Sequence, residues 1–145
     1  MRKAGFRFLD HTADVSVEAQ GSSLEDAFEQ TVYSLMETIT PSYRSLSPII
    51  EKTIKIEAED KEALLFDFLT EFLYLFDVME LIVTKIKIQP IKKYKDKYYL
   101  EAVAYGDKFD KTIHEAGTEV KAITYSYMKI EEKKKDVKIN IVYDI

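Results

Sequence analysis

The chain has 145 residues, 46% of them hydrophobic and 32% charged, and a formal net charge of −5 at pH 7. This length suits one domain with a buried core, and the hydrophobic content argues against disorder. The absence of cysteine excludes disulfides, cysteine-ligated metal centres and thiol nucleophiles, and a chain with two histidines and four glycines has neither a multi-histidine metal site nor a glycine-rich phosphate loop.

The first part of the chain predicts two strands and a helix. Alternating apolar residues indicate a short strand over 6–8 and a second strand over 15–20. Ser22 and Glu25 have the spacing of a capping box at the start of an amphipathic helix. Thr40-Pro41 ends that helix, because proline disfavours a helical conformation in the residue before it.

A further strand and a second helix follow a loop over residues 41–51. Alternation predicts the strand over 54–58, and Asp60 is placed to cap a helix over roughly 61–77. Apolar residues cover more than a third of that helix's circumference. We therefore expect it to be covered on most sides, with its aromatic side chains in the core.

The second half of the chain is dominated by strand patterns. Alternation predicts strands over 82–89, 98–104, 120–130 and 137–143. The connections are a lysine-rich turn over 92–97, a turn at Gly106-Asp107 and a charged hairpin over 131–136. The order ββ-α-β-α-ββ-ββ predicts an α+β fold, a two-layer sandwich in which two helices pack on one face of a mostly antiparallel or mixed sheet of six or seven strands. With no repeat or linker visible, we expect a single domain over 1–145.

Charge is distributed unevenly along the chain. Residues 1–80 hold 7 basic and 16 acidic side chains, whereas residues 81–145 hold 14 basic and 10 acidic ones. A nucleic-acid-binding surface needs a clear basic excess, so the balance argues against a chain coated by nucleic acid, while a basic patch on one face stays open. No apolar stretch is long enough for a signal peptide or a membrane span, so we expect a soluble cytoplasmic protein.

The densest polar cluster is Asp10-His11-Thr12-Ala13-Asp14, between the first two predicted strands. Two carboxylates four residues apart in a turn can converge on a hard cation such as Ca²⁺ or Mg²⁺. Aspartate and threonine are also ordinary turn residues that hydrogen-bond to nearby backbone amides. The spacing alone leaves both interpretations open.

A second acidic group stands at Asp144-Ile145, where a side-chain carboxylate lies next to the terminal one. If the last strand pairs near the first ones, Asp144 comes close to Asp14. Converging carboxylates repel one another unless a cation neutralises them. A solvated, frayed end of the chain is the alternative.

Three further charged residues lie in the second half. His114 stands near two aspartates in a predicted loop, where it either takes part in acid–base chemistry or anchors a turn. Glu119 and Lys121 enter the predicted long strand on one face, which suits an ordinary ion pair. No nucleophile accompanies these residues in a recognisable arrangement.

Taken together, five motifs resemble those of the archease family. They are Phe8-Leu9-Asp10-His11-Thr12-Ala13-Asp14, Glu71-Phe72-Leu73-Tyr74-Leu75-Phe76-Asp77, Gly106-Asp107 with Phe109-Asp110 and His114, Glu119-Val120-Lys121-Ala122-Ile123-Thr124-Tyr125, and Asp144-Ile145. The motifs occur in order along the whole chain with family-like spacing. Each one is weak alone, and the set is specific.

The resemblance implies a small α+β protein that is not itself an enzyme. Archeases activate the GTP-dependent tRNA-splicing ligase, which joins an RNA end with a cyclic or 3′-phosphate to a 5′-hydroxyl. On this resemblance the chain promotes guanylylation of the ligase and multiple turnover. An alternative role for relatives is that of a chaperone-like modulator of a tRNA cytosine methyltransferase. On that resemblance the methyltransferase would be the partner of this chain.

The family's metal site maps onto Asp14, Asp144 and Ile145, with all-oxygen ligands that suit Ca²⁺ or Mg²⁺. The motif residues expected to contact or activate the partner are Asp10, His11, His114, Glu119 and Lys121. One position departs from the family, because Ser126 stands where archeases commonly have histidine.

Two other function classes are consistent with parts of the sequence. A small metal-dependent phosphohydrolase would use Asp10, His11 and Asp14. A direct RNA-binding module would use the interleaved lysines and tyrosines of the second half. We expect the accessory role, with no stable direct RNA binding and no membrane association.

Overall fold

The computed structural model describes residues 4–9 and 14–145, which form two α-helices, one short 3-10 helix and eight β-strands. In chain order these are β1 (Gly5–Leu9), β2 (Asp14–Gly21), α1 (Leu24–Ile39), the 3-10 helix (Tyr43–Ser45), β3 (Ile50–Ala58), α2 (Lys61–Met79), β4 (Leu81–Ile88), β5 (Lys92–Tyr94), β6 (Lys97–Lys108), β7 (Ala122–Lys133) and β8 (Asp136–Asp144). The predicted α+β class and the two helices are confirmed.

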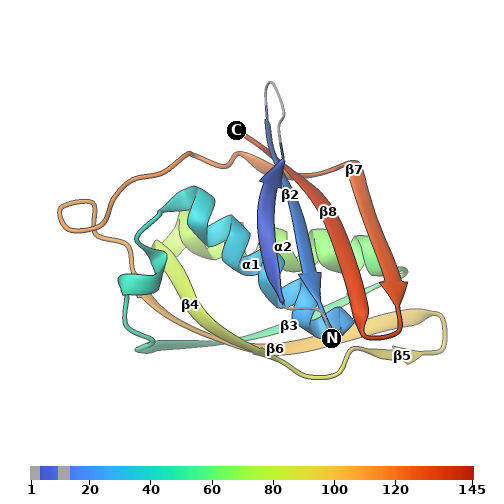
Figure 1. Cartoon of the computed structure of the whole chain (residues 1–145). Coiled ribbons are helices and arrows are strands. Elements are labelled where there is room, and N and C mark those ends of the chain that lie inside the picture. Colours follow the sequence, from blue (N-terminus) through green and yellow to red (C-terminus); the bar gives the residue numbers. More distant parts are fainter. Residues whose placement is uncertain (1–3, 10–13) are drawn as a thin grey trace.

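The strands form two antiparallel sheets rather than the single six- or seven-stranded sheet that was predicted (Figure 1). The first sheet has the order β1-β2-β8-β7. The second has the order β3-β6-β4, with β5 also paired to β6. Alternation along a strand identifies which side chains face inward, but it carries no information about which distant strand is the partner, so the division into two sheets was missed.

Both helices lie between the two sheets, not together on one face as predicted. Helix α1 contacts β2 and β8 of the first sheet and β4 of the second. Helix α2 contacts β7 of the first sheet and β3 of the second. The nearly all-round apolar surface of α2 fits this position, because both of its sides are covered by strands. The expectation that its aromatic residues belong to the core is confirmed at Phe68 and Phe72.

The helix ends follow local capping chemistry. Asp60 caps α2 as predicted, with its side chain accepting a hydrogen bond from the Ala63 N–H at 2.7 Å. Helix α1 begins one residue later than the Ser22–Glu25 box implies. Its N-cap is Ser23, which accepts from the Asp26 N–H at 3.1 Å. Pattern alone does not separate two adjacent serines as caps.

Gly106 lies inside β6, so the turn predicted there is wrong. It is paired with Ile50 on one side and Val83 on the other. A Cβ atom at this position would lie 1.8 Å from the Ile82 carbonyl oxygen. Glycine therefore allows the backbones of β6 and β4 to approach closely. The predicted lysine-rich turn likewise contains a short strand, β5.

Strand β7 begins at Ala122, two residues later than predicted, and it is irregular. Its register with β8 shifts between Thr124 and Lys129. Within the shift, Tyr127 has a left-handed φ of 57°. Five residue steps in β7 face two steps in β8 across this shift, so β7 holds three extra residues there. An odd number of extra residues reverses which face the following side chains occupy, and this breaks the predicted alternation.

Tyr143 fastens β8 to helix α1. Its side chain is 0% exposed, and its hydroxyl lies 2.6 Å from the Ser34 Oγ and donates to the Thr31 carbonyl at 3.0 Å. Burial raises the pKa of this phenol. The last strand is thereby held to the core immediately before Asp144.

Within the described ranges, neither helix has the length and apolar character needed to cross a bilayer.

Gly106→Ala should lower the free energy of unfolding by about 3 kcal/mol, the upper end for overpacking, because the added methyl overlaps the Ile82 carbonyl. Gly5→Ala is the matched control, since a Cβ there meets nothing within 4 Å. Urea unfolding of both variants gives the comparison. Equal stabilities for the two variants would contradict the packing role of Gly106.

Tyr143→Phe should cost about 1–2 kcal/mol at neutral pH, because it removes the buried hydroxyl and its hydrogen bonds. The raised pKa keeps Tyr143 protonated in the folded state while the unfolded phenol ionises near pH 10. Its contribution is therefore complete below about pH 10 and is lost above it, by about 1.4 kcal/mol per pH unit. In urea unfolding, the difference in unfolding free energy between the unmodified protein and Tyr143→Phe should be smaller at about pH 11 than at about pH 8. The same difference at both pH values would contradict this role of the Tyr143 hydroxyl.

Candidate functional site

Asp14 and Asp144 stand opposite each other at one end of the first sheet. Strands β2 and β8 pair antiparallel with Asp14 in register with Asp144, and Ala122 of β7 is in register with Asp144 on its other side. The fold thus places Asp14 and Asp144, which are 130 positions apart in the sequence, opposite each other. Both side chains are partly exposed.

Two carboxylates in register repel one another wherever no cationic group offsets their charges. Directly opposed residues of an antiparallel pair have Cβ atoms about 5 Å apart, and like charges there destabilise the sheet. The Lys121 N–H donates to the Asp144 carbonyl at 2.7 Å, which fixes the backbone and leaves the carboxylate charge unchanged. A bound cation would convert the repulsion into ligation.

The donor set fits a hard cation in part. Both carboxylates offer oxygen ligands, which suit Ca²⁺ or Mg²⁺. Ile145 follows Asp144 and packs partly against the core. Across residues 4–9 and 14–145, no group of three or more histidine or acidic side chains is close enough to hold a metal. Asp10 and His11, the remaining acidic-motif candidates, lie outside the described residues.

The segment before β7 is tied to the end of α1. Gly117 N–H donates to the Ile39 carbonyl at 2.8 Å, and Thr118 N–H donates to the Thr38 carbonyl at 2.7 Å. These bonds satisfy carbonyls that a helix C-terminus otherwise leaves unpaired. A Cβ at Gly117 would lie 2.3 Å from the Thr38 oxygen, so only glycine permits this approach.

Gly117, an isolated glycine in a polar stretch, is the sequence signal that could have indicated this contact between the segment before β7 and the end of α1. The connection positions Glu119 and Lys121, which lie before β7 and not within it as expected. Both are exposed, and the described part of the chain shows no ion pair between them. Ser126 is also exposed, in the irregular part of β7.

A shallow cavity of about 340 Å³ opens beside Asp14. Phe8, Val15 and Pro41 give it apolar walls, and Glu37 and Thr38 add polar ones. Phe8 is 46% exposed although it is aromatic. The acidic end of the sheet therefore adjoins a surface that a protein partner can contact with both polar and apolar groups.

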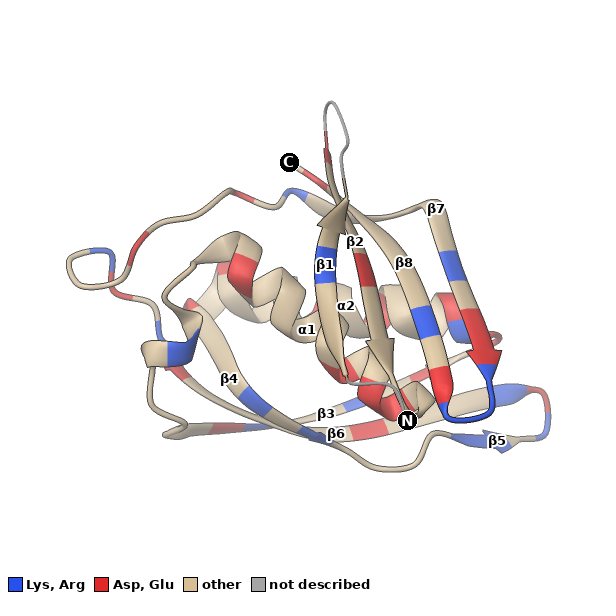
Figure 2. Cartoon of the chain, in the orientation of Figure 1, with Lys and Arg blue, Asp and Glu red and all other residues tan. Residues whose placement is uncertain are grey.

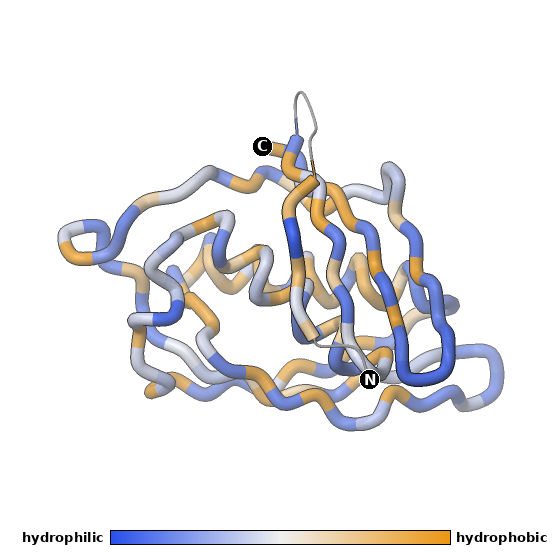
Figure 3. The backbone as a smooth tube through the Cα atoms, in the orientation of Figure 1, coloured by the Kyte–Doolittle hydropathy of each residue, from blue (hydrophilic) through white to orange (hydrophobic). Residues whose placement is uncertain are grey.

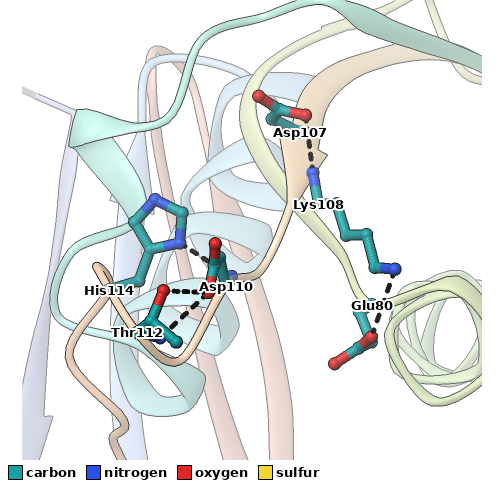
Figure 4. Close-up of polar contacts among 6 residues, drawn as sticks. All are labelled: Glu80, Asp107, Lys108, Asp110, Thr112 and His114. Carbon is teal, nitrogen blue, oxygen red and sulfur yellow. Dashed lines mark hydrogen bonds and ion pairs between the residues drawn. The ribbon is translucent and has the colours of Figure 1, made fainter.

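His114 belongs to the first part of the connection between β6 and β7, and this part of the chain lies well away from the β2–β8 end (Figure 1). Its Nδ1 accepts a hydrogen bond from the Asp110 backbone N–H at 2.9 Å (Figure 4). The contact involves the backbone of Asp110 and not its carboxylate, so the acid–base pair considered from the sequence is not formed.

The Asp110 carboxylate instead organises the turn. Its Oδ1 accepts from the Thr112 N–H at 2.9 Å and from the Thr112 hydroxyl at 2.6 Å. These hydrogen bonds, with a smaller contribution from the charge of Lys108, hold the pKa of Asp110 below its usual value. A cavity of about 710 Å³ lies between this loop, Glu80 and the 3-10 helix region. The cluster is a structured surface loop with a turn-anchoring histidine.

Comparisons with known proteins agree with the motif resemblance. A sequence model of the Archease protein family (MTH1598/TM1083) matches residues 6–145. The protein archease of Pyrococcus furiosus is 43% identical over 122 residues, which is 84% of either chain.

Two solved structures share the fold. The solution structure of Methanobacterium thermoautotrophicum protein 1598 is 31% identical, with a TM-score of 0.84 over 97% of this chain and 99% of that one. The crystal structure of an archease from Thermotoga maritima, described as a possible chaperone, has a TM-score of 0.55 at 23% identity, covering 100% of this chain and 98% of that one.

Asp14→Asn and Asp144→Asn should each abolish stabilisation of the fold by divalent cations, because each removes a carboxylate from the opposed pair. For the unmodified protein, Ca²⁺ at about a hundredfold above its dissociation constant should raise the unfolding free energy by about 2.7 kcal/mol. Asp96→Asn, in a distant turn, is the control and should keep the full response. Thermal unfolding with Ca²⁺, Mg²⁺ or chelator measures it; an unchanged cation response in both variants would contradict the site.

Proposed function

Because the chain belongs to the archease family, we propose that it is a non-catalytic activator of the GTP-dependent tRNA-splicing RNA ligase. In this role it promotes guanylylation of the ligase and allows multiple turnover. Its partner is the ligase, and its cofactor is a divalent cation, Ca²⁺ or Mg²⁺. The cytoplasm is the expected compartment.

The observation that carries this proposal is the register of Asp14 with Asp144. Two carboxylates at the exposed end of a sheet form a cation site that a partner can approach. A metal ion held there would add positive charge near nucleotide phosphates, which is the chemistry that guanylyl transfer needs. Asp14 and Asp144 would hold it, with Ile145 adjacent and Asp10 expected to assist.

The surroundings of the pair also suit a partner surface. Lys121 holds the Asp144 backbone, and Glu119 is exposed two residues before Lys121. We assign these two residues, with Asp10 and His11, to contact with the ligase. The first part of the β6–β7 connection, which carries His114, lies away from this end, so His114 would meet a second part of the partner.

A chaperone-like role toward a tRNA cytosine methyltransferase is the second candidate. The observation that favours it is the description of the Thermotoga maritima relative as a possible chaperone. The phosphohydrolase alternative would use Asp10, His11 and Asp14, and of these the structure describes only Asp14. Intrinsic turnover of phosphate esters with metal alone would support that alternative.

The deciding experiment is RNA ligation by the cognate ligase under single- and multiple-turnover conditions, with and without this protein. We expect guanylylation and multiple turnover to increase when it is present. Asp14→Ala and Asp144→Ala should reduce the stimulation to the level without activator, because the cation site is lost, while Glu51→Ala, at an exposed acidic position of β3, should stimulate normally.

Circular dichroism and thermal unfolding establish that the three variants are folded. Full stimulation by both Asp14→Ala and Asp144→Ala would contradict the proposed role of the cation site. An absence of stimulation by the unmodified protein, with methyltransferase behaviour changed instead, would favour the second candidate.

A further inference from the structure

Two hairpins carry a dense group of exposed lysines. The lysine end is defined as Lys92, Lys93, Lys95 and Lys97 of the β5–β6 hairpin together with Lys133, Lys134 and Lys135 of the β7–β8 hairpin. Residues 92–97 and 133–138 contain eight lysines against two aspartates, a net charge of +6 in a chain whose net charge is −5. These two short segments therefore carry more net positive charge than residues 81–145 as a whole, whose net charge is +4.

The fold brings the two hairpins to the same end of the molecule. Lys61, at the start of α2, forms an ion pair with Glu132 of β7 and lies over the Tyr98 ring of β6 at 5.6 Å. Lys93 lies over the same ring at 5.6 Å. Figure 2 shows the basic segments of both hairpins side by side, and Figure 3 shows that both tips are hydrophilic.

The neighbouring acids do not neutralise this charge. Glu132 is engaged by Lys61, and Glu131 pairs with Lys129 at 2.7 Å. The pKa of Glu131 is lowered by Lys129 first and then by Lys133 and Lys138. Among the described residues, no ion pair involves any of the seven lysines of the lysine end.

Both turns place lysine where another residue is easier to accommodate. Lys95 has φ 57° and Lys135 has φ 58°, each in a two-residue hairpin loop. This left-handed conformation is easiest for glycine or asparagine and costs a lysine about 1 kcal/mol. Turn geometry therefore does not explain why lysine stands there, whereas a charged ligand does.

Tyrosines are interleaved with these lysines. Tyr94 is 62% exposed, with the Lys95 Nζ 5.5 Å from its ring centre. Tyr99 is exposed and is paired in register with Lys92. Lysines beside exposed aromatic rings are the combination that binds single-stranded nucleic acid, through phosphate charge and base stacking. An acidic protein segment would use the lysines but would gain little from the rings.

We propose that the lysine end binds the phosphodiester backbone of single-stranded RNA, with Tyr94 and Tyr99 available for stacking. The choice of RNA rests on the proposed function. The lysine end lies at the opposite end of β8 from Asp144, eight residue steps or about 26 Å away. One protein can therefore present its acidic end to the ligase while the lysine end holds the RNA strand. This contact is weak without the ligase, in agreement with the expectation of no stable direct binding.

Fluorescence anisotropy with a labelled single-stranded RNA of about 12 nucleotides tests this without the ligase. At about 50 mM salt we expect a dissociation constant on the order of 10⁻⁵ to 10⁻⁴ M that weakens as salt rises. The triple variant Lys95→Glu, Lys134→Glu and Lys135→Glu should weaken binding by at least about tenfold and reduce the salt slope by about 2. The matched control Lys55→Glu, Lys87→Glu and Lys111→Glu carries the same change in net charge on other faces and should weaken it less than about threefold.

A double variant separates a ligand role from a turn role. Lys95→Gly with Lys135→Gly should leave stability unchanged or raised, because both positions have positive φ, and yet should weaken RNA binding. Equal losses of RNA affinity in the two charge-reversal triple variants would overturn the proposal. Tighter binding of an acidic peptide, poly-glutamate, than of RNA would also overturn it. Absent RNA binding together with intact ligase stimulation would overturn it while leaving the proposed function in place.

Discussion

The arrangement of the candidate site depends on one constraint, the position of β8 between β2 and β7. The last strand of the sequence is an inner strand of its sheet, hydrogen-bonded on both sides. The buried Tyr143 hydroxyl fastens it to α1 as well. Asp144 is therefore held on a rigid element in register with Asp14.

Much of the local structure could be predicted from the sequence. The 3.6-residue and two-residue periods identified both helices and most strands, and Asp60 was recognised as a cap because its partner is three residues away. The placement of Asp14 near Asp144 was a conditional inference from acidic clusters at both ends of the chain. The pairing of β2 with β8 places the two residues in register.

The features that were missed depend on contacts between distant segments. The division into two sheets is set by pairings such as β2 with β8, which no local pattern records. Gly106 resembles a turn residue, but its role is to admit a neighbouring backbone. The bulge in β7 and the tie between Gly117 and α1 have the same origin, because each is defined by the partner segment and not by its own sequence.

The fold thus separates two chemistries along β8, opposed carboxylates at one end and a group of lysines at the other. The central claim is that Asp14 and Asp144 form a cation site, and paramagnetic broadening by Mn²⁺ in amide NMR spectra tests it most directly. We expect the amide signals of Asp14, Ala122 and Asp144 to broaden first, while those of the β7–β8 turn persist. Broadening centred instead on the loop of Asp110 and His114, or no selective broadening at all, would contradict it.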